Sequence, residues 1–162
     1  MDKPIGIMLV DDYGPVHRSL EVVNDICPDL RVIAHASTGQ EAIQLCEVKQ
    51  PDVILMDVIM PYMNGIEATR IIHGRHPDIK ILALSSFHDE TCVQDMIEAG
   101  AVGYVLKNTS LKSLVYAVQA VRTGQTIFSP EVTHSLHNPK VAEDRASASD
   151  GPPSPGHLNC WW

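Results

Sequence analysis

Apolar runs recur along the first two thirds of the chain at nearly even spacing, with segments of mixed polarity between them. The runs are IGIMLV (5–10), RVIAHA (31–36), DVILM (52–56), KILALS (80–85) and VGYVL (102–106). Four of the five are continuous or nearly continuous rather than strictly alternating, which is typical of strands buried on both faces of a parallel sheet. The pattern therefore predicts five strands at these positions.

The segments between the runs have the periodicity of amphipathic helices. Val16, Leu20 and Val23 form one apolar stripe, and Gly100 and Gly124 stand where helices should end. The last helix carries a longer stripe, formed by Leu111, Leu114, Val115, Val118 and Val121. Alternating strands and helices predict an α/β fold, namely a doubly wound, five-stranded parallel sheet of flavodoxin-like order 2-1-3-4-5.

Polar and charged side chains that can bind ions or take part in catalysis follow four of these strands. Asp11 and Asp12 end the first strand, Asp57 ends the third, Ser85 ends the fourth and Lys107 ends the fifth. In an open parallel sheet, function gathers at the carboxyl ends of the strands. We therefore expect three acids, a hydroxyl and an ammonium around one shallow site, although a single acid at a strand end often only caps a helix or solvates a loop.

Such a cluster of carboxylates predicts a bound cation. Two like charges ~4 Å apart repel by about 4 kcal/mol at an effective dielectric near 20. Lys107 neutralises part of this charge, and Mg2+ suits a partial carboxylate cage that shares a substrate phosphate. A metal and a lysine beside a carboxylate favour phosphoryl transfer, with the carboxylate as the nucleophile.

Composition narrows the classes of partner and the cellular location. The 162-residue chain has a formal net charge of -8, which disfavours general nucleic-acid binding. Its amino-terminal apolar run is too short for a signal peptide, and no stretch is long enough for a membrane span, so a cytoplasmic protein is expected.

From Asn138 onward Pro, Ser, Gly and charged residues dominate, which indicates a linker or disordered tail ending in Trp161 and Trp162.

Four blocks of this sequence, MLVDD, ILMDVIMPYMNG, ILALSS and GYVLKN, resemble the motifs of bacterial response-regulator receiver domains. The segment LVYAVQAVRTGQTIFSPEV resembles the receiver end of NarL/FixJ-type regulators. The resemblance implies a receiver domain over residues 1–126. Residues 127–162 are then a linker and disordered tail, with no room for the helix-turn-helix domain that such regulators usually carry.

The resemblance implies a role for each acid of the site. Asp57 matches the phosphoacceptor, and Asp12 matches a direct Mg2+ ligand. Asp11 matches the second acid, which often acts through water, and the backbone carbonyl of Ile59 matches the third protein ligand. Gly65 shapes the loop after Asp57 by relieving steric limits where the next helix begins.

The resemblance also implies a phosphate-binding lysine and a switch. Lys107 matches the phosphate-binding residue, Ser85 the switch hydroxyl and Tyr104 the switch aromatic. Phosphate on Asp57 would draw Ser85 toward it and let Tyr104 turn inward, changing the surface formed by the fourth helix, fifth strand and fifth helix. A homodimer or heterodimer is expected there. Asn108 follows Lys107 where many receivers have a proline, so no cis-proline switch is expected.

Three functions remain open. The favoured one is a non-enzymatic phosphorelay module that receives phosphate from a sensor histidine kinase and acts through protein contacts. The second is the receiver portion of a DNA-binding regulator whose output domain is missing. The tail's only lysine and arginine, Lys140 and Arg145, predict no direct DNA binding by this chain. The third is an aspartyl-phosphate phosphatase, which DVIMP after the strand disfavours because those enzymes typically have a DxDxT-like run.

Overall fold

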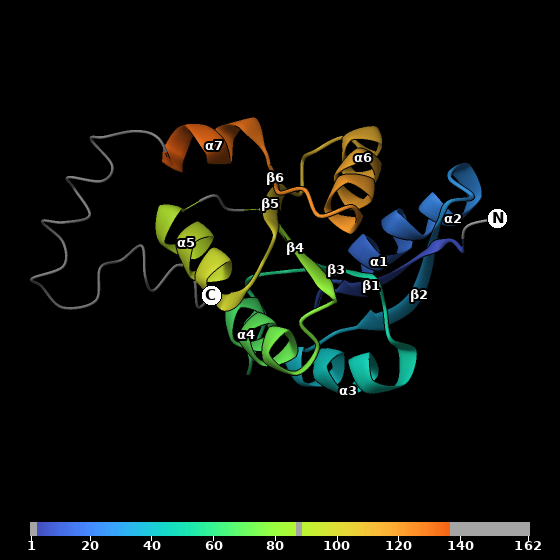
Figure 1. Cartoon of the computed structure of the whole chain (residues 1–162), viewed down its shortest axis with the longest axis horizontal. Helices are drawn as coiled ribbons and strands as arrows, with labels where there is room; N and C mark the ends of the chain where they lie inside the picture. The colour runs from blue at the N-terminus through green and yellow to red at the C-terminus, as the bar shows by residue number, and fades with distance from the viewer. Residues whose placement is uncertain (1–2, 87–88, 137–162) are drawn as a thin grey trace, which may run out of the picture.

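The computed structural model describes residues 3–86 and 89–136, and it has the predicted α/β architecture. One parallel sheet of six strands has the order β2-β1-β3-β4-β5-β6 (Figure 1). The strands are β1 (Ile5–Val10), β2 (Leu30–Ala36), β3 (Val53–Met56), β4 (Lys80–Ser85), β5 (Gly103–Leu106) and β6 (Ile127–Phe128). The first five coincide with the five apolar runs to within one residue at either end, and their order 2-1-3-4-5 is confirmed.

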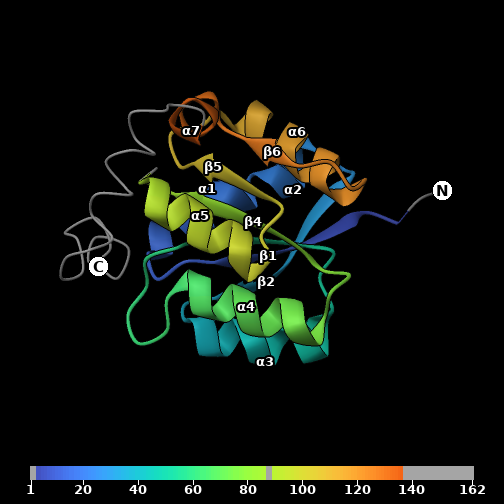
Figure 2. The ribbon, with the colours of Figure 1, turned by 60° about the vertical axis from the view of Figure 1, so that its left-hand side comes forward.

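Helices cover both faces of the sheet, as a doubly wound fold requires (Figure 2). They are α1 (Gly14–Glu21), α2 (Val23–Ile26), α3 (Gly39–Lys49), α4 (Gly65–Arg75), α5 (Glu90–Ala99), α6 (Leu111–Arg122) and α7 (Pro130–Leu136). The stripe that begins at Val16 thus spans two short helices, α1 and α2. Gly100 and Gly124 follow α5 and α6 with φ of 119° and 97°, so both act as the predicted helix stops.

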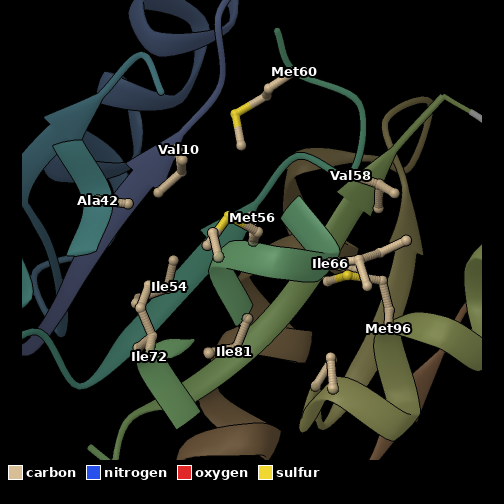
Figure 3. Packing of buried hydrophobic residues seen from close by; sticks show 14 of the residues in the cluster. Val10, Ala42, Ile54, Met56, Val58, Met60, Ile66, Ile72, Ile81 and Met96 are labelled. Atoms are coloured by element: carbon tan, nitrogen blue, oxygen red, sulfur yellow. The ribbon is translucent and has the colours of Figure 1, made fainter. Parts of the chain in front are cut away.

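The core consists of two apolar clusters, one on each face of the sheet. Along β1, Met8 and Val10 point into the cluster under α3, α4 and α5, whereas Ile7 and Leu9 point into the cluster under α2 and α6. Figure 3 shows part of the first cluster, where strand residues meet the apolar side chains of the helices. Burial on both faces explains why the strands read as continuous apolar runs. Among the described residues, no helix is both long and apolar enough to cross a membrane.

The sixth strand was not predicted from the sequence. β6 pairs with β5 in parallel, with Phe128 opposite Tyr104. Ser129, directly after β6, donates its backbone N–H to the carbonyl of Tyr104 at 3.0 Å. Its buried hydroxyl accepts the N–H of Leu106, also at 3.0 Å. The prediction of five strands was therefore one short, because a two-residue strand leaves no apolar run to detect.

Helix α7 continues the folded unit beyond the predicted domain boundary. α7 packs against α5, and its Val132 is completely buried in the same cluster as Tyr104. Packed elements thus extend through residue 136, whereas the predicted domain ended at 126. The remainder of the predicted tail, residues 137–162, lies outside the described residues, and so do Trp161 and Trp162.

Shortening Val132 should test whether this segment belongs to the cooperative core. Val132→Ala removes two methyl groups from a fully buried position, so the free energy of unfolding should fall by about 1–3 kcal/mol. Val48→Ala is the matched control because Val48 is 76% exposed, and it should change stability by less than about 0.5 kcal/mol. Urea unfolding measures both, and equal midpoints for the two variants would contradict the packing of α7.

Candidate functional site

Three carboxylates converge at the carboxyl ends of two neighbouring strands. β1 and β3 are paired, with Val10 opposite Met56, and the acids follow directly after them. Asp11, Asp12 and Asp57 each offer an oxygen, and these oxygens lie within 4.8 Å of one another. Asp11 and Asp57 are only 3% and 5% exposed, whereas Asp12 is exposed to solvent. The predicted convergence of the three acids is therefore observed.

Lys107 provides the cation of this site. It follows β5, where its backbone N–H donates to the carbonyl of Ser85 at 2.8 Å. Its Nζ lies 2.7 Å from Oδ2 of Asp11 and 3.4 Å from Oδ1 of Asp57. Burial alone would lower the pKa of Lys107, but the hydrogen bond to Asp11 and the charges of both acids raise it above its usual value. The side chain is therefore a permanent ammonium group at physiological pH.

The pKa of Asp57 is raised far above its usual value. Burial, followed by the negative charge of Asp11, raises the pKa of Asp57 from 3.8 to about 7. The charge and hydrogen bond of Lys107 oppose this shift without cancelling it, and Asp12 adds a smaller upward effect. One ammonium among three carboxylates leaves excess negative charge, which disfavours a third ionised carboxylate in a partly dry site. A divalent cation bound to oxygen ligands would relieve this excess.

The remaining ligand set shows which acid is available to a metal. Asp11 is already engaged within the protein, since its Oδ1 accepts the N–H of Tyr13 at 2.9 Å and its Oδ2 forms an ion pair with Nζ of Lys107 at 2.7 Å. Asp12 is exposed and faces the same cluster. Ile59 is half-buried, and its side chain packs against the core. The role of its carbonyl as a ligand stays a prediction.

The loop after Asp57 is held against the strand end by Gly65. The N–H of Gly65 donates to the carbonyl of Val58 at 2.8 Å. A Cβ on Gly65 would collide with the carbonyl oxygen of Asp57 and would lie 2.9 Å from Cα of Val58. Asn64 caps α4, accepting the N–H of Glu67 at 2.9 Å. Gly65 is therefore required by the close approach of two backbone segments, beyond the predicted relief of steric limits at the helix start.

The two predicted switch residues adjoin the site, and both are buried. Ser85 is 1% exposed at the end of β4, and Tyr104 is completely buried in β5. Burial raises the pKa of Tyr104 to about 12, although a hydrogen bond with Ser85 acts in the opposite direction. Tyr104 thus already lies inside the fold beside Ser85 in this structure, and its inward turn on phosphorylation stays a prediction.

The predicted partner surface is also partly covered by the chain itself. Its helices, the fourth and fifth of the expected fold, correspond to α5 and α6, since the first predicted helix is divided into α1 and α2. β6 pairs with the edge of β5 that the prediction left open, and α7 packs against α5 (Figure 2). A partner approaching this face would therefore meet β6 and α7 as well.

A pair of histidines contacts the backbone of the site and was not predicted from the sequence. Nε2 of His17 lies 2.6 Å from the backbone carbonyl of Asp11, and its Nδ1 lies 2.8 Å from Nδ1 of His35. His35 in turn contacts Oε1 of Glu21 through Nε2 at 3.0 Å. This series of contacts, from Glu21 through His35 and His17, holds the backbone at Asp11 in place. His17 and His35 lie on α1 and β2, and no local motif indicated that they meet.

Comparisons with known proteins agree with this geometry. The family model described as the response regulator receiver domain matches residues 7–119. The transcriptional regulatory protein DegU of Brevibacillus brevis is 37% identical over 152 residues, which cover 92% of this chain and 64% of that protein. The response regulator VraR of Staphylococcus aureus is 36% identical over 134 residues, covering 83% and 64%. The chain thus spans slightly less than two thirds of the length of these relatives, which are named as regulators rather than as enzymes.

A solved structure shows the same likeness. The crystal structure of a LuxR-family two-component response regulator from Aurantimonas sp. SI85-9A1 superposes with a TM-score of 0.77 at 32% identity. The match covers 89% of this chain and 99% of that one. The shared fold and the sequence identity therefore extend beyond the acidic site to nearly the whole described structure.

Proposed function

The chain belongs to the family of response regulator receiver domains, and we propose that Asp57 is the residue that accepts a phosphoryl group from a sensor histidine kinase. The domain then acts as the phosphorylation-dependent switch of a two-component phosphorelay, changing its contacts with other proteins. The observation that carries the proposal is the recessed carboxylate of Asp57, with Nζ of Lys107 3.4 Å away and two further acids in oxygen-ligand range.

The donor set fits Mg2+, which prefers oxygen ligands and keeps several waters. Asp12 and Asp57 would hold the ion directly, with the carbonyl of Ile59 as the third protein ligand. Asp11 would act through water, because its own oxygens are engaged by Lys107 and the N–H of Tyr13. When bound, the ion neutralises charge on the phosphoryl oxygens.

The chain's own residues account for the rest of the transfer. A carboxylate oxygen of Asp57 attacks phosphorus, the new O–P bond forms, and the P–N bond to the donor imidazole breaks, with the electron pair leaving on nitrogen. Lys107 stabilises the negative charge on the equatorial oxygens. The burial of Asp57 limits water at the nucleophile, which favours transfer from a docked donor over hydrolysis of that donor.

The structure suggests a route from the phosphate to the protein surface. Phosphate on Asp57 would draw the Ser85 hydroxyl away from Tyr104, since a charge-assisted hydrogen bond is stronger than one to a neutral phenol. β5 carries Tyr104, and Ser129 is hydrogen-bonded to β5 on both sides of Val105. A shift of β5 would therefore reach β6 and α7. Homodimer or heterodimer contacts through α5, β5 and α6 would respond to it.

Labelling with a small phosphodonor tests the proposal. Incubation with acetyl phosphate and Mg2+ should add one phosphate to the wild-type chain, detected by intact mass spectrometry. Asp57→Asn should abolish this labelling. Asp78→Asn should leave it unchanged, because Asp78 is an exposed carboxyl before β4, at the other end of the sheet. Equal labelling of the Asp57 variant and the wild type would refute the assignment.

A second candidate is that this chain is the receiver portion of a DNA-binding transcriptional regulator of NarL/FixJ type. It is favoured by the name and length of relatives such as DegU, of which the chain matches 64%. A helix-turn-helix domain encoded downstream in the same frame would decide for this alternative. Both candidates share phosphorylation at Asp57 and differ only in the output.

A further inference from the structure

The loop after the phosphoacceptor contains an unusual backbone turn. The N–H of Met63 donates to the carbonyl of Pro61 at 2.8 Å, which closes a three-residue turn around Tyr62. Tyr62 has a φ of 68°, in the left-handed region. The γ-turn with positive φ at its centre is the rare and strained form, and a bulky aromatic residue seldom occupies it. Glycine or asparagine would suit this position better.

Side chains on both sides hold the turn in place. Met60, before the turn, is 4% exposed and belongs to the core cluster (Figure 3). Met63, after it, packs over Gly39 so closely that a Cβ there would lie 2.9 Å from the Met63 Cγ. Asn64 is buried and caps α4. The loop is therefore anchored at both ends, and Tyr62 is presented on a fixed support.

The ring of Tyr62 is fully exposed on the loop after β3, and this loop and the loop after β1 form the rim of the acidic site. Its relative exposure is 101%, and it makes no side-chain contact that would explain the strained turn. Tyr13 is 62% exposed on the loop after Asp11 and Asp12, and its own N–H donates to Asp11. The two loops that hold the three acids thus each present an exposed tyrosine, while Asp57 between them is recessed.

We infer that Tyr62, aided by Tyr13, is an anchor for the protein that delivers the phosphoryl group to Asp57. The inference rests on the proposed function, because a recessed nucleophile requires the donor to approach over this rim. Fixed, exposed aromatic rings bury a large area at little entropic cost and are typical of interface residues that dominate binding. The partner's surface would carry the phosphorylated histidine beside an apolar depression that receives the phenol ring.

The test compares a protein donor with a small one. Purified histidine kinases are loaded with radioactive phosphate, and the one that labels the wild-type chain fastest is used at subsaturating concentration. Tyr62→Asn, which suits the left-handed turn, should lower the rate of transfer from this kinase about tenfold or more. Its labelling by acetyl phosphate and its melting temperature should not fall. Tyr62→Phe keeps the ring and should transfer at nearly the wild-type rate.

Tyr116→Asn is the control, because this tyrosine is also exposed, at 62% as for Tyr13, but lies in the middle of α6. It should leave both rates unchanged. An unchanged kinase rate in Tyr62→Asn overturns the inference. An equal fall with both donors also overturns it, since Tyr62 would then act on the site through the loop rather than through docking. Failure of the wild-type chain to be labelled by either donor would instead refute the proposed function, and the inference with it.

Discussion

Gly65→Ala is expected to lower the free energy of unfolding by at least about 3 kcal/mol and to displace the phosphoacceptor. The new methyl group would overlap the carbonyl oxygen of Asp57 and would lie 2.9 Å from Cα of Val58. Both neighbours are backbone atoms next to a buried strand, so neither can rotate away as a side chain would. Either the loop separates from β3, breaking the bond from the Gly65 N–H to the Val58 carbonyl, or the end of β3 shifts.

A second glycine in the same helix provides the control. Gly74 is exposed in the last turn of α4, and a Cβ there would meet no atom within 4 Å. Gly74→Ala should therefore stabilise the protein by roughly 0.5–1 kcal/mol, because alanine loses less backbone entropy on folding. Urea unfolding and acetyl phosphate labelling measure the two effects. Wild-type stability and labelling in Gly65→Ala would contradict the close approach at this position.

The positions of five strands could be predicted because each is a long apolar run buried on both faces. β6 could not, because Ile127 and Phe128 are both only half-buried and the strand is defined by its bonds to β5. The lack of a long apolar pattern also explains why the predicted domain ended at residue 126. Of the α7 side chains that the structure describes, residues 130–133, only Val132 is buried, and one valine in a short segment gives no periodic pattern.

The residues of the acidic site could be predicted in part. Parallel strand order brings Asp11 and Asp57 together, and the strand-end rule adds Lys107. The sequence did not indicate how they pair. Lys107 lies closer to Asp11 than to Asp57, so the lysine that we propose as the phosphate ligand already holds one acid in place and leaves the other less neutralised. That asymmetry depends on side-chain positions within a few ångströms, which no sequence pattern specifies.

Two further features of the site depend on long-range packing. The switch role of Tyr104 stays a prediction from resemblance, whereas its burial depends on tertiary packing, since it lies in the same apolar cluster as residues of α5 and α7. His17 and His35 are far apart in the sequence and meet only because α1 lies against the end of β2. Contacts of this kind become visible only when the elements are assembled.

The metal-free protein is expected to lose stability as the pH rises from 5.5 to 8. The pKa of Asp57 is about 7 in the folded chain and 3.8 as its ordinary value. Between these values the folded chain binds the proton and the unfolded chain does not, so the free energy of unfolding falls with rising pH. For these two values the fall between pH 5.5 and pH 8 is about 2 kcal/mol, and it levels off above pH 8.

Asp57→Asn isolates this contribution, because it removes the titrating group and leaves every other ionisable residue in place. Its stability in EDTA should vary less with pH by the same ~2 kcal/mol, and it should exceed that of the wild type at pH 8. Asp78→Asn should follow the wild-type curve, since this carboxyl is exposed and far from the cluster. Parallel curves for the wild type and Asp57→Asn would contradict the raised pKa.

Mg2+ should reverse the loss, and more strongly at high pH. The ion binds ionised carboxylates in the folded site, so it competes with the proton on Asp57. At a fixed concentration one hundred times the Kd measured at pH 8, Mg2+ should add about 2.7 kcal/mol to the free energy of unfolding at pH 8 and clearly less at pH 5.5.

Asp12→Ala should reduce this gain in stability, because Asp12 is the acid left for the ion while Asp11 is held by Lys107. Thermal unfolding at both pH values, with and without Mg2+, distinguishes the two effects. If the gain from Mg2+ were equal at pH 5.5 and pH 8, the ion would not be competing with a proton on Asp57, and its ligands would have to be sought elsewhere on the chain.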